Sequence, residues 1–384
     1  MALKVAGRAS IAPFHVMEVM RAAAERERAG GDVLHLEVGQ PSTPAPQGVL
    51  EAARRALVED GLGYTLALGI EPLREAISGH YRDRYGVDVA TRRVVVTTGS
   101  SGGFLLAFLA AFDSGDRVAL AEPGYPCYRN ILAALGLRPV ALPVTGATNF
   151  QPTAAMVEAL APDVAGLIVA SPSNPTGTML EPGALAGLST ACRRRGIRLI
   201  SDEIYHGITF GPAAETAAAL DADNIVVNSF SKYFSMTGWR LGWLVLPDDL
   251  LKPVERLAQN LFISPPTLSQ RAALAAFDCH EELDRNVQRY RANRDLLQGE
   301  LPGAGFDDLS RAEGAFYVYA AVTRLANDSE ALCATLLAET GVAITPGIDF
   351  DPERGRHWVR FSFSGATADV AEAARRLKAW RARR

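Results

Sequence analysis

The run Ser229-Phe-Ser-Lys-Tyr-Phe-Ser-Met-Thr-Gly-Trp-Arg240 contains Lys232, one of only four lysines in a chain that has thirty-five arginines. Arginine cannot replace lysine as a nucleophile, because its guanidinium stays protonated, whereas a buried lysine amine can lose its proton and attack an aldehyde. The hydroxyl residues around Lys232 and the cation of Arg240 indicate Schiff-base chemistry beside a bound anion. Pyridoxal phosphate is the cofactor to which this combination points. A plain surface lysine in a loop is the competing interpretation.

On both sides of this run, short β-branched segments alternate with alanine- and leucine-rich segments, which is the pattern of a parallel sheet covered by helices. After residue 281 a long helical stretch is followed by two strands, at 315–320 and 358–363, and two helices, at 329–340 and after an N-cap at Thr367. We therefore predict an α/β fold in which a large domain has a mostly parallel seven-stranded sheet between helices, and a smaller domain is α+β. The seven strands are expected at 94–98, 117–121, 138–142, 166–171, 198–202, 225–230 and 241–245.

The predicted domains are an N-terminal arm with part of the small domain at 1–45, a large cofactor-binding domain at 46–280 and a small C-terminal domain at 281–384. The proline-rich piece Pro41 to Pro46 is the expected crossing between domains. A length of 384 residues with 48% hydrophobic residues suits two domains with an extensive core.

Charge and cysteine usage exclude several classes of partner. The net charge of -4 gives no basic face for nucleic acid or for an anionic membrane surface. The four cysteines are widely spaced, and neither a CxxC pair nor a secretory leader is present, which favours free thiols over a disulfide frame or a metal site. No apolar stretch approaches the roughly 20 residues that span a bilayer. We expect a cytoplasmic protein without a structural metal.

Two glycine- and proline-rich turns follow predicted strands, where open α/β sheets bind ligands. Thr98-Gly-Ser-Ser-Gly-Gly103 opens a helix, so its backbone N–H groups and hydroxyls can face a phosphate at the positive helix end. Glu122-Pro-Gly-Tyr-Pro-Cys-Tyr128 places Tyr125 at a rigid turn, where its ring can stack on a flat heterocycle. A tight strand-to-helix turn and ordinary aromatic packing are the competing interpretations.

Two further segments end predicted strands with polar side chains. Ser171-Pro-Ser-Asn-Pro-Thr-Gly177 can aim the amide of Asn174 into a cleft, although a proline-stiffened turn would have the same composition. Arg198-Leu-Ile-Ser-Asp-Glu-Ile-Tyr205 places Asp202 at the end of an apolar strand, where a carboxylate needs a partner. A protonated ring nitrogen of a cofactor would supply that partner, and a helix N-cap role for Asp202 is the alternative.

Together these residues resemble the class I/II aminotransferases of the aspartate aminotransferase superfamily, fold type I. The resemblance extends from about Gly39 to Arg360, and it rests on residues that occur in the family's order and approximate spacing: Gly39, Tyr64, Tyr125, Asn174-Pro-Thr-Gly177, Asp202, Tyr205, Ser229-x-Ser-Lys232, Arg240 and Arg360.

The resemblance implies a role for each of these residues. Lys232 would form the internal aldimine with pyridoxal phosphate and then move the substrate proton as general base. Asp202 would pair with the pyridinium nitrogen, while Tyr205 and Asn174 would hydrogen-bond the phenolic oxygen. The remaining cofactor contacts implied by the resemblance are stacking by Tyr125 and phosphate binding by Ser100, Ser101, Gly102, Ser229 and Arg240, with Tyr64 reaching the phosphate from the partner subunit of a homodimer.

The same resemblance makes Arg360 the clamp for the substrate α-carboxylate, assisted by Asn174 and the backbone of Gly39. Because Arg360 and Lys232 belong to different predicted domains, substrate binding should draw the domains together, with the segment Ile11 to Val16 as a lid. Met17 and Met20, three residues apart, are interpreted as an apolar helix face.

Substrate choice is predicted from a missing charge. The dicarboxylate-selective branch has an arginine six positions before a Pro-Pro pair, and the corresponding position before Pro265-Pro266 is Gln259. We therefore predict a neutral, aromatic or aliphatic amino donor and a 2-oxo acid such as 2-oxoglutarate as acceptor, unless Arg129 or Arg138 supplies the charge. The alternatives are an aspartate-selective enzyme and a C–S lyase on the same fold. A cofactor-binding regulator without turnover is more remote, because no basic helix-turn-helix precedes Gly39.

Overall fold

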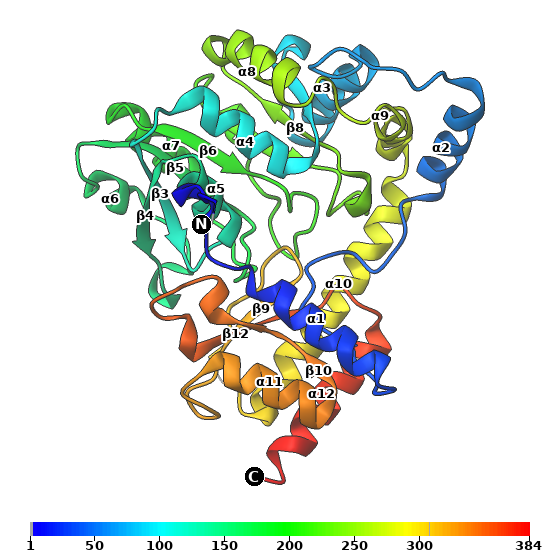
Figure 1. Cartoon of the computed structure of the whole chain (residues 1–384), viewed down its shortest axis with the longest axis vertical. Coiled ribbons are helices and arrows are strands. Elements are labelled where there is room, and N and C mark those ends of the chain that lie inside the picture. The colour runs from blue at the N-terminus through cyan, green and yellow to red at the C-terminus, as the bar shows by residue number, and fades with distance from the viewer. Residues whose placement is uncertain (1–2, 307) are drawn as a thin grey trace.

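A seven-stranded sheet forms the centre of the larger part of the molecule (Figure 1). The structure is a computed structural model that describes residues 3–306 and 308–384. The strand order is β2-β8-β7-β6-β5-β3-β4, and only β8 runs antiparallel to its neighbours. The predicted mostly parallel sheet is thereby confirmed. Its strands are β2 (Val94–Thr97), β3 (Arg117–Glu122), β4 (Arg138–Pro143), β5 (Val164–Ala170), β6 (Arg198–Asp202), β7 (Ile225–Ser229) and β8 (Gly242–Val245).

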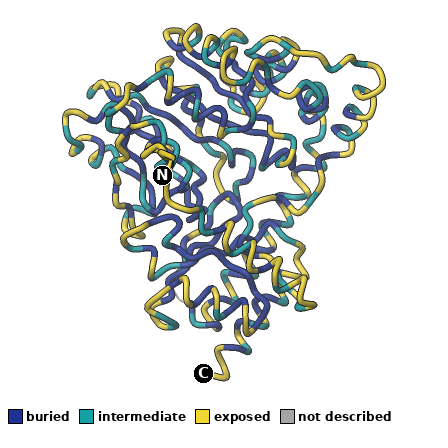
Figure 2. The backbone as a smooth tube through the Cα atoms, in the orientation of Figure 1, coloured by how far each residue is buried: buried dark blue, intermediate teal, exposed yellow. Residues whose placement is uncertain are grey.

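Both faces of this sheet are covered by helices because both faces are apolar. Val95 and its neighbours Val94 and Val96 point to opposite faces, as alternating strand residues must, and each face has its own apolar cluster. One face packs against α4 (Gly99–Ala111), α5 (Pro126–Ala134) and α8 (Asp248–Leu261). The other packs against α3 (Glu71–Tyr85), α6 (Ala154–Glu158), α7 (Ala184–Arg194) and α9 (Thr267–Ala273). The central strands of the sheet are therefore mostly dark blue in the burial view (Figure 2), whereas the edge strand β4 is largely exposed.

A three-stranded antiparallel sheet, β11-β12-β9, forms the core of the smaller part. The long helix α10, yellow in Figure 1, runs from the larger part into this smaller part. The chain also returns here at its start, because β1 pairs in parallel with β10. The elements of this part are β1 (Leu34–His35), α10 (His280–Glu300), β9 (Tyr317–Ala321), α11 (Ser329–Thr340), β10 (Val342–Ala343), β11 (Thr345–Pro346), β12 (Trp358–Ser362) and α12 (Thr367–Arg381). Helix α2 (Gln47–Glu59) packs against α9 of the larger part.

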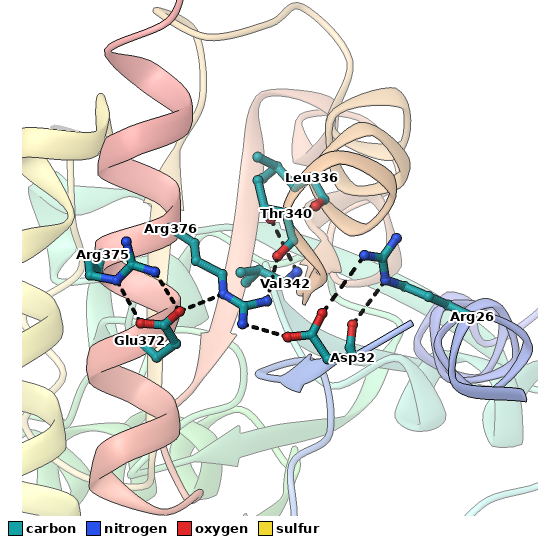
Figure 3. A network of polar contacts seen from close by, with 8 residues as sticks. All are labelled: Arg26, Asp32, Leu336, Thr340, Val342, Glu372, Arg375 and Arg376. Carbon is teal, nitrogen blue, oxygen red and sulfur yellow. Dashed lines mark hydrogen bonds and ion pairs between the residues drawn. The ribbon is translucent and has the colours of Figure 1, made fainter. Parts of the chain in front are cut away.

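The first helix, α1 (His15–Arg28), is attached to the smaller part by a polar network at its C-terminal end (Figure 3). Arg26 donates to the carbonyl oxygen of Asp32, and Arg376 of α12 donates to the Asp32 carboxylate and to the carbonyl oxygen of Thr340. Partly exposed ion pairs of this kind contribute little stability each. Their consequence is geometric, because α1 and α12 are held in one arrangement.

Two details of the predicted elements were wrong. The strand expected from Ala315 begins only at Tyr317, because Ala315 has a positive φ angle of 56°, which an extended strand does not contain. Thr367 is the first residue of α12 rather than its N-cap. The capping position, with extended backbone angles, belongs to Ala366.

All four cysteines are free thiols, as their spacing predicted. Over residues 3–306 and 308–384, every helix is too short or too polar to cross a membrane. The same ranges hold no group of three or more histidine, cysteine, aspartate or glutamate side chains placed to bind a metal ion.

Candidate active site

A cavity of about 630 Å³ lies where the carboxyl ends of β5 and β6 and the turn after β7 face the smaller part. This is the edge at which parallel α/β sheets bind ligands. The cavity brings together most of the residues predicted from the sequence, which come from separate segments along the chain: Gly39, Ser100, Ser101, Tyr125, Asn174, Asp202, Tyr205, Lys232, Arg240 and Arg360.

Lys232 projects into the cavity from the turn that follows β7. Its Nζ donates to the carbonyl oxygen of Gly39 at 2.5 Å, and no carboxylate of the described residues lies within ion-pair distance of it. Burial, followed by the positive charges of Arg360 and Arg240, lowers the pKa of the Lys232 amine to about 8. An appreciable fraction of this amine is therefore neutral near pH 7 to 8, as a nucleophile requires.

Asp202 ends β6 and is almost fully buried in the cavity floor. Its carboxylate accepts hydrogen bonds from the hydroxyl of Tyr128 and, at 3.1 Å, from the backbone N–H of Ile204. Burial raises the pKa of Asp202 to about 6, although both hydrogen bonds and Lys232 act in the opposite direction. The residues after Asp202 form a turn and no helix, so the N-cap alternative was wrong. The carboxylate is ionised at neutral pH and suits a cationic partner in the cavity.

The first turn of α4 and Arg240 form a positively charged end of the cavity. Ser100 and Ser101 line it at the helix N-terminus, where backbone N–H groups have no partner within the helix. Gly99 has φ +74°, and a Cβ there would lie 2.6 Å from Nη2 of Arg240, so only glycine lets the guanidinium approach the helix end this closely. This cradle is suited to an anion such as a phosphate.

Arg360, on β12 opposite the sheet, is a buried cation with neutral partners. It is 3% exposed, and its Nη1 donates to Oδ1 of Asn174 at 2.9 Å. Its Nη2 donates to the carbonyl oxygen of Glu37 and, at 3.2 Å, to Oγ1 of Thr345, while its Nε has no hydrogen-bond partner among the described residues. A buried charge without a counter-ion is costly unless an anionic ligand completes the site.

Aromatic residues form the remaining wall. Tyr125 is at the N-cap of α5 and meets Tyr128 edge to face, with ring centroids 5.3 Å apart. The hydroxyl of Tyr205 lies 2.7 Å from the hydroxyl of Tyr317. Burial raises the pKa of Tyr125, Tyr205 and Tyr128 well above the usual value, so these hydroxyls stay protonated and act as hydrogen-bond donors.

Three predicted residues do not line the cavity. Gly102 lies within α4, where a Cβ would meet Oγ1 of Thr98 at 2.4 Å. Ser229 is buried, and its hydroxyl donates to the carbonyl oxygen of Leu241 at 3.0 Å, whereas Ser231 two residues later faces the cavity. Tyr64 is 84% exposed on the surface of the chain. The phosphate roles of these three residues stay predictions.

The N-terminal segment lies at the mouth of the cavity. The ring of Phe14 approaches Tyr125 edge to face at 6.2 Å, and the N-terminus of α1 is fixed by Asp349, whose carboxylate accepts from the N–H groups of His15 and Val16 at 3.1 and 3.2 Å. The apolar wall here consists of Phe14, Val16, Met17, Met20, Val38 and Ile204. Met17 and Met20, interpreted from the sequence as a plain apolar helix face rather than a functional stripe, both line the cavity, and Met17 is 55% exposed. Movement of the segment as a lid stays a prediction.

The cations that could have reversed the substrate prediction lie elsewhere. Arg129 donates to the carbonyl oxygens of Asp349 and Phe350, and Arg138 is exposed on β4. Gln259 is exposed on α8, and none of the three lines the cavity. The lysine and arginine residues that do line it are Lys232, Arg240 and Arg360.

Sequence reasoning missed Tyr128 and Tyr317. Tyr128 had a signal, because it lies three residues after Tyr125 at the end of the quoted segment Glu122 to Tyr128, and residues three apart share one face if a helix begins there. Tyr317 had no such signal in the sequence. It belongs to an apolar strand, and the register of this strand with β12 decides on which face of the sheet its side chain lies.

Comparisons with known proteins agree with this geometry. The sequence model of the family "Aminotransferase class I and II" matches residues 31–377. The chain is 52% identical over 381 residues to a valine-pyruvate aminotransferase of Mycobacterium tuberculosis, with 98% of each sequence covered. Among solved structures, an aminotransferase from Mycobacterium tuberculosis superposes with a TM-score of 0.97 at 52% identity over all of both chains. Aspartate aminotransferase from Thermus thermophilus with maleate gives a TM-score of 0.93 at 30% identity, covering 98% of this chain and all of the other.

Proposed function

The chain belongs to the class I and II aminotransferases and is a transaminase, and from this premise we propose that it works with pyridoxal phosphate bound in the cavity around Lys232. The observation that carries the proposal is that an amine and a guanidinium lie on opposite sides of one cavity. The amine of Lys232 and the guanidinium of Arg360 come from opposite sides, and no carboxylate of the described residues forms an ion pair with either. Such a site has room for an aldehyde at one group and a carboxylate at the other.

The residues present fit this cofactor. The cradle of Ser100, Ser101 and Arg240 would hold the phosphate, and the Gly99 backbone leaves the space that a Cβ would fill. Asp202 would face the ring nitrogen, since its buried carboxylate lines the cavity and suits a cationic partner. Tyr125 offers its ring to the flat heterocycle.

Bound pyridoxal phosphate supplies an electron sink that stabilises negative charge at the substrate Cα. Lys232 would provide the amine that holds the cofactor. Once substrate displaces it, the same Nζ would take the proton from Cα and deliver it to the cofactor carbon that carried the aldehyde. Arg360, whose Nη1 donates to Oδ1 of Asn174, would hold the α-carboxylate together with Asn174 and so orient Cα towards Lys232. Asp202 would keep the ring nitrogen protonated, and Tyr205 would donate to the ring oxygen.

We propose a neutral aliphatic amino acid, of the valine class, as the donor. The apolar wall of Met17, Met20, Val38 and Ile204 suits an uncharged side chain, and the three cations of the cavity are already assigned to cofactor and carboxylate. The name of the valine-pyruvate aminotransferase relative supports this choice. The same wall favours a small acceptor such as pyruvate. The 2-oxoglutarate expected from the sequence is the second candidate.

We expect the value of kcat/KM for valine, leucine or alanine to exceed that for aspartate by about tenfold or more, because the second carboxylate of aspartate would be desolvated against apolar side chains. The measurement is an initial-rate series with single donors at a fixed concentration of pyruvate, repeated with 2-oxoglutarate. A preference for aspartate over all three neutral donors contradicts the substrate proposal and leaves the transaminase assignment intact.

Replacing Arg360 with lysine is expected to lower kcat/KM by about a hundredfold or more, because lysine cannot form the two-pronged bond to a carboxylate. KM for the amino acid and for the 2-oxo acid should both rise, since both carry the same carboxylate. The visible absorption of bound cofactor should stay unchanged.

The matched control for this substitution is Arg356→Lys, an exposed arginine four residues earlier in the chain. This variant should retain wild-type kinetics. Equal KM values for the wild type and Arg360→Lys contradict the clamp role.

We also propose a homodimer in which Tyr64 reaches the partner's phosphate cradle. Support comes from the exposure of Tyr64 beside other exposed apolar residues, Leu57, Val58 and Leu66.

The domain boundaries at residues 45 and 280 remain our proposed domain assignment. The free thiols support a cytoplasmic location.

A further inference from the structure

Tyr317 lies between the two halves of the candidate active site. It is the first residue of β9, is fully buried and lines the cavity. In the antiparallel pairing of β9 with β12, Tyr317 is opposite Ser362, so Arg360 is its diagonal neighbour on the same face of the sheet. The guanidinium carbon of Arg360 lies 4.5 Å from the centre of the Tyr317 ring, within the range of a cation–π contact.

The hydroxyl of Tyr317 reaches across to the large sheet. It lies 2.7 Å from the hydroxyl of Tyr205, which is a normal hydrogen-bond distance for two hydroxyl groups. The rings of the two tyrosines meet edge to face, with centroids 5.6 Å apart. Burial raises the pKa of both side chains, so both keep their protons and one donates to the other.

The backbone at Gly39 is shaped around this hydroxyl. A Cβ at residue 39 would lie 2.0 Å from the Tyr317 oxygen, a distance that real Cβ atoms do not show. Gly39 also accepts the hydrogen bond of Lys232 through its carbonyl oxygen. Tyr317 therefore contacts Arg360, Tyr205 and Gly39 directly, and through Gly39 it is connected to Lys232.

We propose that Tyr317 is a positioning residue that holds Tyr205 as a hydrogen-bond donor towards the ring oxygen of the cofactor and connects this donor to the Arg360 clamp. The inference rests on the proposed function. When the Tyr205 proton points to the cofactor, the Tyr205 oxygen accepts the proton of Tyr317, and a hydroxyl that accepts a hydrogen bond is a stronger donor in turn. A stronger donor at the ring oxygen weakens the hold of that oxygen on the proton shared with the Lys232 nitrogen.

The experiment is a pH titration of the visible absorption band in cofactor-loaded wild type, Tyr317→Phe and Tyr319→Phe. Tyr319 is a matched control, because it is two residues further along β9, equally buried, and its hydroxyl has no hydrogen-bond partner among the described residues. We expect the pH midpoint of the absorption titration to rise by about half a pH unit or more in Tyr317→Phe. In Tyr319→Phe the midpoint should stay at the wild-type value.

Tyr205→Phe and the double variant test whether Tyr317 acts through Tyr205. Tyr205→Phe should raise the midpoint further, and adding Tyr317→Phe to it should change nothing more. An unchanged midpoint in Tyr317→Phe overturns the proposal, as does a Tyr317→Phe effect that persists without the Tyr205 hydroxyl. A lower melting temperature of cofactor-free Tyr317→Phe with a wild-type midpoint assigns a packing role only and also overturns it.

Failure of this inference is distinguishable from failure of the proposed function. If wild-type protein forms no visible band with pyridoxal phosphate, the proposed function fails. If the band and transamination are present and only the midpoint of Tyr317→Phe is unaffected, the positioning role alone is wrong.

Discussion

Replacing Lys232 with alanine is expected to lower kcat by about 10⁴-fold or more, because one side chain serves as both nucleophile and general base. The pKa of about 8 leaves part of the Lys232 amine neutral at working pH, and the nearby cations Arg360 and Arg240 help to keep it so. Alanine removes the amine without filling the cavity. The measurement is the rate of 2-oxo acid formation from valine at saturating substrate.

A second readout does not depend on turnover. Borohydride reduction of the wild type with pyridoxal phosphate should attach the cofactor covalently to Lys232, and the alanine variant should show no such attachment at that position. Lys252→Ala, an exposed lysine on α8, is the matched control and should behave as wild type. Retention of more than about a hundredth of wild-type kcat by Lys232→Ala contradicts the assignment.

Replacing Asp202 with asparagine is expected to lower kcat by about 10³-fold or more, because the neutral amide no longer keeps the ring nitrogen of the cofactor protonated. The geometry should survive, since the Tyr128 hydroxyl can accept from an asparagine N–H as readily as it donates to the carboxylate. Cofactor should still bind through Lys232 but more weakly. Steady-state kinetics and a cofactor titration measure the two effects, and wild-type kcat in Asp202→Asn contradicts the role.

Although Asp202→Asn should lower kcat, it should not lower the stability of the cofactor-free protein. Burial raises the folded pKa of Asp202 from 3.8 to about 6. Between these values the folded state binds more protons than the unfolded state, so stability falls as pH rises through this window, and the cost is fully present above pH 6. A shift of two units corresponds to the order of 3 kcal/mol.

At pH 7.5, cofactor-free Asp202→Asn should therefore melt at the same temperature as wild type or a few degrees higher. Addition of pyridoxal phosphate should raise the melting temperature of wild type by more than that of the variant. A large loss of stability in cofactor-free Asp202→Asn would show that the carboxylate supports the fold rather than the ligand. Thermal unfolding with and without cofactor distinguishes these outcomes.

The sequence predicted the large sheet well because each of its strands is a short apolar run bounded by turn residues. It also predicted the cavity residues that follow those strands, such as Asp202, Asn174 and Lys232, since carboxyl ends of parallel strands meet at one edge. The family resemblance then added Arg360, which no local pattern distinguishes from the other arginines of the chain.

The remaining details depend on contacts between distant segments. The register of β9 with β12 places Tyr317 towards the cavity, and the Tyr317 hydroxyl leaves no space for a Cβ at Gly39. The positive φ of Ala315 shortens a strand that β propensity alone extends. Met17 and Met20 line the mouth because Asp349, on a distant part of the chain, fixes the start of α1.

The central claim, that this chain transfers amino groups through Lys232, is tested most directly by a half-reaction. Purified cofactor-loaded protein is mixed with valine without any 2-oxo acid while its visible absorption is recorded. We predict loss of the visible band with one equivalent of 2-oxo acid per site and no ammonia, because the amino group stays on the protein-bound cofactor. An unchanged band with every neutral amino acid contradicts the claim, and continued release of 2-oxo acid with ammonia over many turnovers indicates a lyase instead.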